Sequence, residues 1–219
     1  MLRKKELIAV IEEGENSRVE FKQRFSTPEK IAKEIIAFAN TRGGYMIFGV
    51  EDDGTICGVE SEKGEIELIN QVCTSLIEPP LQCESFSYNI RGNEVVVTEV
   101  PESRNKPHRI QDYLESLDIR TAQVYIRVDD KSVQAGKEMI RVLKHQNSAE
   151  GLRNYFIGDL EKKVFEYLEK NERIDVKIFC NISNISERRA SRTLVKMVRA
   201  GLLFIHIKDN GEEYFTIGM

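Results

Sequence analysis

Acidic side chains lie at two separated places near the start of the sequence. Glu15 and Glu20 belong to the segment 15–22 (ENSRVEFK), and the acids Glu51-Asp52-Asp53 follow an apolar run that ends at Val50. A helix-like stretch and a buried strand lie between them, an order that is expected to bring these acids towards one edge of a sheet. Clustered carboxylates can hold Mg²⁺ or Mn²⁺, activate water and stabilise a leaving phosphate oxygen. The simpler alternative is that Glu20 and Asp52 are strand-end residues beside an ordinary Asp-Gly turn.

A second set of residues with chemical potential lies on a helix predicted over 186–200. At about 100° per residue, Ala190, Leu194, Met197 and Val198 fall on one side of this helix and are expected to face a core. Only Glu187 is acidic in this stretch, whereas an ordinary solvated face mixes charges of both signs. This pattern predicts nucleic-acid contact, with a solvated face as the alternative. The cations on the opposite side are Arg188, Arg189, Arg192, Lys196 and Arg199.

The elements that must position the first acids can be predicted in order. Residues 2–13 have helical spacing, and Gly14 is a suitable end. Ser26-Thr27-Pro28-Glu29 has the cap, the proline and the early acid of a helix start, and this helix is expected to run to about Asn40. Gly43-Gly44 follow the C-terminus of that helix, so they are expected to supply a left-handed cap and a close strand start instead of a phosphate cradle. The strands predicted here cover 19–22, 45–50 and, after the Asp53-Gly54 turn, 55–59.

The next stretch predicts a hairpin and two further helices. Pro79-Pro80 should end the first of these helices, and a polar connection over 101–121 contains His108. A lone loop histidine is usually exposed to solvent, which is the expectation here, with ligand sensing through this connection as an open alternative. The predicted elements are a helix over 65–77, strands over 84–90, 94–100 and 123–128, and a closing helix over 136–145.

A change of composition at residues 146–151 (QNSAEG) predicts a domain boundary. The expected domains are therefore 1–148 and 149–219. The second domain should contain helices over 159–170, 176–180 and 186–200, followed by a hairpin around Asn210-Gly211. Three helices followed by a two-stranded ribbon is the order of a winged helix-turn-helix, whose second motif helix lies in the major groove of duplex DNA. Lys208 and Asn210, at the tip of the ribbon, are expected to add contacts.

The bulk composition limits the classes of function. A formal net charge of −4 excludes a protein that coats nucleic acid indiscriminately, so any such site must be local. Four cysteines without a CxxC pair predict reduced thiols and no structural zinc. The apolar run near the N-terminus is too short for a signal peptide or a membrane span. The expected location is the cytoplasm, with no membrane partner.

Several ordered segments carry a resemblance to a known family. They are ENSRVEFK (15–22), IAFANTRGG (36–44), FGVEDDG (48–54), KPH (106–108) and YIRV (125–128). Over about residues 8–145 the chain resembles the Schlafen AlbA-like domain family. The resemblance implies an α+β fold with a mixed sheet and helices. It also implies a role seen in prokaryotic members, which are commonly described as DNA-binding domains of transcriptional regulators, often with a winged helix behind them.

The same resemblance implies an enzymatic alternative. Nucleolytic Schlafen relatives carry three catalytic carboxylates, and their counterparts here are Glu15, Glu20 and Asp52. They would form the metal site of a Mg²⁺- or Mn²⁺-dependent endoribonuclease. RNA would need flanking cations, because acids repel a polyanion. The candidates are Lys22, Arg24, Arg42, Arg109 and Arg127.

The leading interpretation is a DNA-binding transcriptional regulator that needs no cofactor for DNA binding. The AlbA-like domain would oligomerise, sense a ligand or add nucleic-acid contacts. A homodimer is expected because paired winged helices read paired half-sites. The alternatives are the metal-dependent endoribonuclease and a protein-interaction module, since a fold alone does not settle function.

Overall fold

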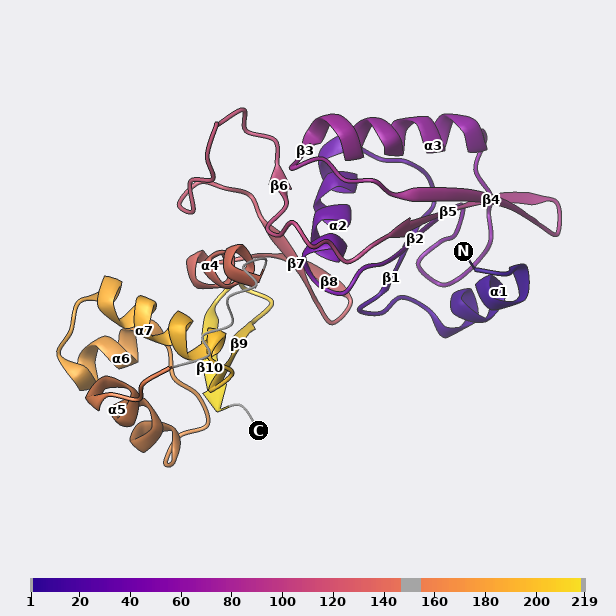
Figure 1. The fold of residues 1–219 in the computed structure, drawn as a ribbon. Coiled ribbons are helices and arrows are strands. Elements are labelled where there is room, and N and C mark those ends of the chain that lie inside the picture. Colours follow the sequence, from indigo (N-terminus) through magenta and orange to yellow (C-terminus); the bar gives the residue numbers. More distant parts are fainter. Residues whose placement is uncertain (1, 147–154, 218–219) are drawn as a thin grey trace. The chain divides into compact units, whose positions relative to one another are not determined.

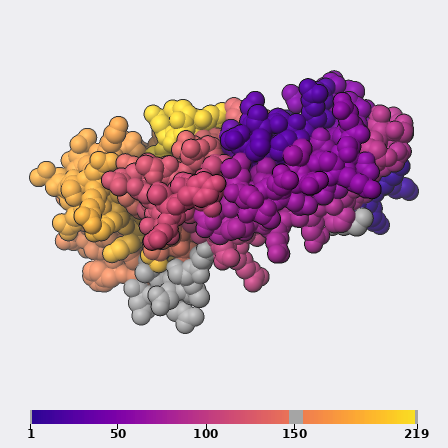
Figure 2. Space-filling model, turned by 90° about the horizontal axis from the view of Figure 1, so that it is seen from above, coloured from indigo at the N-terminus to yellow at the C-terminus, as the bar shows by residue number. Residues whose placement is uncertain are grey.

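The protein is described by a computed structural model that covers residues 2–146 and 155–217. The chain divides into two compact units, Met1–Gln134 and Ala135–Met219, and Figure 2 shows the chain in space-filling form, coloured along the sequence. The first unit contains α1 (Lys4–Glu13), β1 (Val19–Lys22), α2 (Pro28–Asn40), β2 (Gly44–Phe48), α3 (Glu62–Gln71), the π-helical turn η1 (Val72–Leu76), β3 (Ile77–Glu78), β4 (Glu84–Ile90), β5 (Asn93–Val100), β6 (Arg109–Ile110), β7 (Tyr125–Val128) and β8 (Lys131–Gln134). The second unit contains α4 (Lys137–Gln146), α5 (Asp159–Leu168), α6 (Val176–Ser183), α7 (Glu187–Arg199), β9 (Leu203–Ile207) and β10 (Glu213–Ile217).

A four-stranded mixed sheet with the order β1-β2-β5-β4 organises the first unit. β1 is parallel to β2, and the other neighbours are antiparallel. Side chains alternate between the two faces of β2, so Met46 and Phe48 pack in one core with residues of α2, while Ile47 packs in the other with residues of α1. Helices α2 and α3 therefore cover one face and α1 the other (Figure 1). The expected α+β class with a mixed sheet is confirmed.

The helix that leads into the sheet begins and ends as its sequence predicts. Thr27 caps α2, with its hydroxyl accepting a hydrogen bond from Lys30 N. At the other end Gly43 adopts a φ of +67° and donates its N–H to Phe38 O. Gly44 then starts β2 so close to its neighbours that a Cβ there would lie 2.5 Å from Arg18 O and from the Phe38 ring. The glycine pair is therefore architectural.

Replacing Gly44 by alanine is expected to destabilise the first unit by about 1–3 kcal/mol, because the new methyl group overlaps backbone and a buried ring. Urea unfolding followed by NMR signals of this unit measures the loss. Gly64→Ala is the matched control, since a Cβ there meets only the Ser61 hydroxyl, at 3.2 Å. An equal loss in both variants would show that close packing at residue 44 is not the cause.

A buried asparagine ties the long polar connection to α2. The Nδ2 of Asn40 donates to the carbonyl oxygens of His108 and Tyr125, and its Oδ1 accepts from His108 N. The expectation of a solvent-exposed His108 is wrong, because only 1% of this residue is exposed. Its Nδ1 lies 2.7 Å from Pro79 O and its Nε2 lies 2.6 Å from Ser103 Oγ. Burial lowers the pKa of His108, so this histidine is a neutral structural residue.

Several elements of the first unit differ from the sequence expectation. No strand forms over 55–59, where the described residues show only an isolated bridge between Val50 and Ile56. The long helix begins earlier than predicted, at Glu62, because Ser61 caps it through a hydrogen bond from Gly64 N. Strand β8 was not expected, and it pairs antiparallel with β7.

The second unit is a helical domain with a terminal hairpin. Its core includes Val164, Phe179, Leu194 and Phe215, from α5, α6, α7 and β10. The three helices and the antiparallel pair expected from the sequence are present. Helix α4, expected to close the first domain, belongs to this second unit. The predicted boundary between residues 148 and 149 lies outside the described residues and stays a prediction. The two compact units divide after Gln134.

None of the helices within the described ranges is both long and apolar enough to cross a membrane.

Candidate nucleic-acid interface and carboxylate cluster

Helix α7 follows α6 after a short turn. Asn184 ends α6 in the left-handed conformation, with a φ of 50°. Ser186 then caps α7, its hydroxyl accepting a hydrogen bond from Arg189 N. Ala190, Leu194 and Met197 are fully buried, as the helical spacing predicts. One side of α7 is thus fixed to the core, which directs the other side to solvent.

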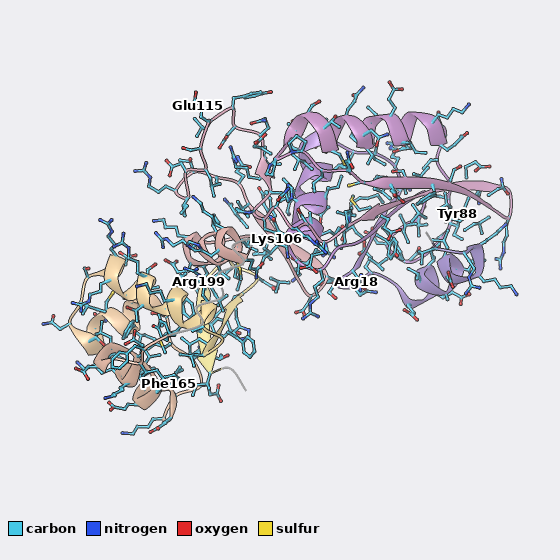
Figure 3. The ribbon with its side chains drawn as sticks, viewed as in Figure 1. Arg18, Tyr88, Lys106, Glu115, Phe165 and Arg199 are labelled. Carbon is cyan, nitrogen blue, oxygen red and sulfur yellow. The ribbon has the colours of Figure 1, made fainter. Side chains whose placement is uncertain are left out.

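The exposed side of α7 carries the predicted cations. Arg188, Arg189, Arg192 and Lys196 are exposed. Arg199, which Figure 3 labels, is half-buried near the end of the helix. Within residues 2–146 and 155–217, none of these five side chains takes part in an ion pair. Arg199 also acts on His145, in the last turn of α4. Burial, and then the positive charge of Arg199, lower the pKa of this histidine. This cationic face of α7 (Arg188, Arg189, Arg192, Lys196 and Arg199) can therefore accept phosphate oxygens without first breaking an internal ion pair.

The two hairpin residues expected to add contacts are engaged within their own turn. Lys208 Nζ pairs with Glu212 Oε2 at 2.7 Å. Asn210 Oδ1 accepts a hydrogen bond from Glu212 N at 3.1 Å. Asn210 is exposed and Lys208 half-buried. Both residues shape the tip of the hairpin, and their contact with DNA stays a prediction.

The first unit brings the three acids singled out in the sequence into electrostatic reach of one another. Glu15 precedes the edge strand β1, and its Oε1 accepts the N–H of Phe21 at 2.7 Å. Burial raises the pKa of Glu15, and the negative charges of Glu20 and Asp52 add to that rise. The N–H of Phe21 and the charge of Lys22 act in the opposite direction. A half-buried carboxyl group with like charges nearby is the expected electrostatic signature of an acidic cluster.

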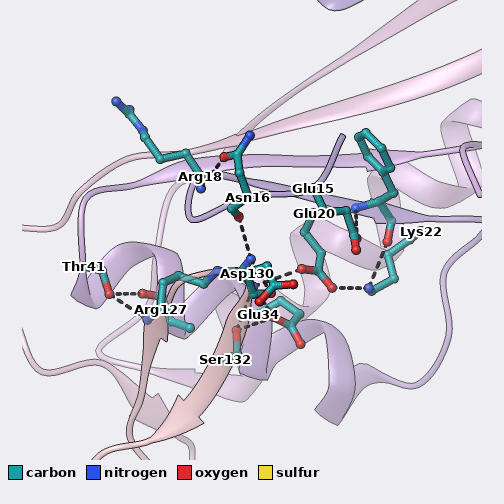
Figure 4. A network of polar contacts seen from close by, with 12 residues as sticks. Glu15, Asn16, Arg18, Glu20, Lys22, Glu34, Thr41, Arg127, Asp130 and Ser132 are labelled. Atoms are coloured by element: carbon teal, nitrogen blue, oxygen red, sulfur yellow. Dashed lines mark hydrogen bonds and ion pairs between the residues drawn. The ribbon is translucent and has the colours of Figure 1, made fainter. Parts of the chain in front are cut away.

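Glu20 is held by two cations (Figure 4). One of its carboxylate oxygens pairs with Lys22 Nζ, and the other lies 3.0 Å from Arg127 Nη1. The same Arg127 nitrogen pairs with Glu34 of α2 at 3.1 Å. Arg127 Nη2 donates to the carbonyl oxygens of Asn16 and Asp130, each at 2.9 Å. The guanidinium group therefore joins β1, α2 and the β7–β8 hairpin.

The acidic cluster in this arrangement does not fit a metal ion. Its donors are chemically suitable, because carboxylate oxygens suit Mg²⁺ and Mn²⁺. Both oxygens of Glu20 are, however, already bound by Lys22 and Arg127. No group of three or more His, Cys, Asp or Glu side chains in the described part of the chain could hold a metal ion. The three-carboxylate metal site stays a prediction that would require Glu20 to leave its ion pairs.

Two of the cations expected to contact nucleic acid from the first unit are buried instead. The side chain of Arg127 is 1% exposed and that of Arg109 is 7% exposed. Arg109 donates to Asp112 Oδ1 and to Leu114 O, which anchors the loop that carries Glu115 (Figure 3). Burial and internal partners thus rule out direct phosphate contact by these two arginines in this conformation. Lys22 is half-buried in its pair with Glu20, and Arg42 is exposed.

Sequence reasoning missed the partners that complete the Arg127 network. Glu34 and Ser132 lie 93 and 5 residues from Arg127 in the chain. The available signal was Arg127 itself, which stands between apolar residues of a short strand, Ile126 and Val128. A buried arginine requires carboxylate or carbonyl partners, so an arginine at this position predicts acidic partners on neighbouring elements.

Comparison with known proteins places much of the first unit in a known family and finds relatives of parts of the chain. The family model described as Schlafen, AlbA_2 matches residues 15–136, which is more than half of the chain. A protein of Ureaplasma parvum serovar 3, described as an uncharacterized ATP-binding protein, is 33% identical over 87 residues. That match covers 37% of this chain and 24% of the length of that protein.

Two solved structures show partial similarity. One is the N-terminal domain of a Nitrosomonas europaea protein described as related to the ATP-dependent DNA helicase RecG, with a TM-score of 0.44 and 24% identity, covering 53% of this chain and 84% of that one. The other is a protein of Corynebacterium diphtheriae, with a TM-score of 0.44 and 22% identity, covering 62% of this chain and 29% of that one. Similarity at this level carries no inference about function.

Proposed function

Because the chain belongs to the Schlafen AlbA_2 family, we propose that it binds nucleic acid and that its second unit reads duplex DNA. The observation that carries this proposal is the cationic face of α7. Four of its side chains are exposed, and all five are free of ion pairs within the described residues. Unpaired cations on one helix face suit a phosphate backbone and the guanine edges of a major groove.

The order of the elements supports a winged helix-turn-helix. Helices α6 and α7 are separated by the turn at 184–186, and the β9–β10 hairpin follows α7. In this class of domain the second helix of the motif enters the major groove, which is the place that α7 would take. The hairpin would act as the wing, with Lys208 and Asn210 at its tip beside the DNA backbone.

We further propose that the protein acts in transcription as a homodimer. A single short helix reads few base pairs, so two copies on paired half-sites would supply the specificity that regulation needs. The first unit would then serve oligomerisation, ligand sensing or additional contact, the last with the help of the exposed Arg42. ATP binding, the printed description of the Ureaplasma relative, is not part of the proposal, because the sequence contains no GxxxxGK[ST] segment.

Selection of bound sequences from a random duplex DNA library tests the proposal. We expect enrichment of a defined sequence, and a binding constant that falls as salt rises with a log–log slope of about −0.9 for each phosphate contacted. Binding of single-stranded RNA under the same conditions serves as the comparison. Equal binding of all duplexes would remove sequence reading, and no duplex binding at low salt would remove the proposal.

A metal-dependent endoribonuclease is the second candidate function. The observation that favours it is Glu15, whose pKa is raised by burial and by the charges of Glu20 and Asp52. When bound, Mg²⁺ or Mn²⁺ would supply an activated water and neutralise phosphate charge. Because the present arrangement does not fit a metal, this candidate ranks second.

Glu15→Gln separates the two functions. If the chain cleaves RNA with Mn²⁺, this change should lower the rate by at least about 100-fold, because Glu15 would be a metal ligand and even the loss of a group that hydrogen-bonds to a ligand costs about 10- to 100-fold. The measurement is cleavage of a labelled RNA with and without the metal. Glu13→Gln, at an exposed position of α1, is the control and should keep full activity. A parent protein without Mn²⁺-dependent cleavage ends the nuclease interpretation.

A further inference from the structure

The first turn of helix α4 is held by a side chain from a distant part of the chain. Its first N–H groups have no partner within the helix, as in every helix. Glu213 of β10 supplies the missing acceptors, with its two carboxylate oxygens accepting from Glu138 N at 3.2 Å and from Met139 N at 2.8 Å. A side chain 75 residues further along the chain thus closes the start of α4.

A second acid extends this contact to α7. Glu138 Oε1 accepts from the hydroxyl of Ser191 at 2.7 Å and from Arg141 Nη1 at 2.8 Å. Arg141 Nη1 also donates to Ser191 Oγ at 2.7 Å. Ser191 lies on the buried side of α7, 4% exposed. The acid pair therefore connects α4 both to β10 and to the helix that carries the cationic face.

The two carboxyl groups need a proton between them. Burial, and then the neighbouring Glu138 carboxyl group, raise the pKa of Glu213, because two ionised carboxylates repel each other and cannot hydrogen-bond to each other. The backbone closes over the pair, because a Cβ on Gly136 would lie 2.4 Å from the carboxyl carbon of Glu213. Among the charged groups of α4, Arg141 acts on Glu138, and Glu138 acts on Glu213. Helix α7 contributes the hydroxyl group of Ser191, which acts on Glu138. With one proton bound, the pair carries a single negative charge, which Arg141 balances.

We propose that α4 is docked on β10 and α7 by a proton that Glu213 shares with Glu138, so that the docking of this helix weakens as the pH rises. The cluster of two acids, one arginine and one serine carries the proposal through the hydrogen bonds that hold each acid in place and through its closed surroundings. It makes α4, the first helix of the second unit, a pH-dependent element of that unit. The proposal is independent of nucleic-acid binding, because its readout is the helix itself.

The direction of the pH effect follows from the protonation of Glu213. Burial, and the hydrogen bond to Glu138, raise the pKa of Glu213 to about 8 in the docked state. Once α4 is released, the group returns towards its ordinary value of about 4.3. The shared proton therefore stabilises the docking of α4 fully when the pH is below the ordinary pKa of glutamate. This stabilisation is lost as the pH rises towards 8. Docking should weaken by about tenfold for each pH unit in between and change little above.

Amide hydrogen exchange of the full chain, measured by NMR between pH 6 and pH 8 and corrected for intrinsic exchange, tests this. Protection of the α4 amides should fall by about tenfold per pH unit in the parent protein. In Glu213→Gln it should stay constant, because the neutral amide accepts from Met139 N and donates to Glu138 without a titrating proton. Glu212→Gln is the matched control, since Glu212 is exposed and pairs with Lys208 of the same hairpin, and it should keep the parent slope.

Two results would overturn the proposal. One is α4 protection in the parent protein that does not vary with pH, and the other is a Glu213→Gln variant with the parent slope. A measurement on the unchanged chain covers the case in which the variant fails to fold. The ¹³C carboxyl signal of Glu213 should titrate with a midpoint near 8, and a midpoint below about 6 would contradict the shared proton.

Discussion

Replacing Arg188 and Arg192 together by alanine is expected to weaken binding to duplex DNA by about 10- to 100-fold. The log–log slope of the binding constant against salt should become shallower by about 2, because each lost phosphate contact removes about 0.9. Both side chains are exposed on α7 and make no ion pair within the described residues, so folding should not change. Fluorescence anisotropy with a selected duplex at several salt concentrations measures both quantities.

Lys163→Ala with Lys170→Ala is the matched control for this double variant. It removes the same charge from the second unit, at exposed positions on and just after α5. If binding follows net charge alone, the two double variants will weaken it equally, and α7 is then not the interface. If neither variant weakens binding, the helix-turn-helix proposal is wrong. Loss in the α7 variant alone, with the shallower slope, supports groove binding by α7.

Local patterns predicted those parts of the fold that local interactions determine. Thr27 caps α2, and Ser186 caps α7, each through a backbone N–H three residues ahead. The periodicity of α7 separated buried Leu194 from exposed Arg192. In both helices the deciding contacts lie within one or two turns, so the sequence window contains the necessary information.

Placements that depend on distant partners could not be predicted in this way. The amphipathic pattern of α4 shows that it has a buried face but not which unit covers that face, and the answer is supplied by Glu213 and Ser191. Arg127 was expected at the surface because arginine usually is. Its partner Glu20 lies 107 residues away, and only the folded sheet brings the two together.

The acidic cluster also combines features that the sequence predicts with a contact that only the folded structure shows. The sequence places Glu15, Glu20 and Asp52 on segments that the parallel pairing of β1 with β2 brings near one another. It does not show that Arg127 reaches Glu20 from the β7–β8 hairpin. That contact converts Glu20 from a free acid into part of an ion-pair network, and it changes which function the cluster supports best.

Replacing Arg127 by alanine is expected to destabilise the first unit by about 3–5 kcal/mol. The side chain is 1% exposed, and its loss leaves the buried acids Glu20 and Glu34 without their shared cation. It also removes the group that stacks on Phe38, 4.6 Å from the ring centre. Urea unfolding followed by the methyl signals of the first unit gives the change in the free energy of unfolding.

A surface arginine provides the comparison for this last effect. Arg120 pairs with Asp118, and its side chain is 79% exposed, so Arg120→Ala should have little effect on unfolding. The triple variant Arg127→Met, Glu20→Gln and Glu34→Gln should recover much of the loss, because most of the cost comes from unpaired buried charge and not from the missing contact. If the triple variant were as unstable as Arg127→Ala, packing against Phe38 and the bonds to Asn16 and Asp130 would be the main role of this arginine.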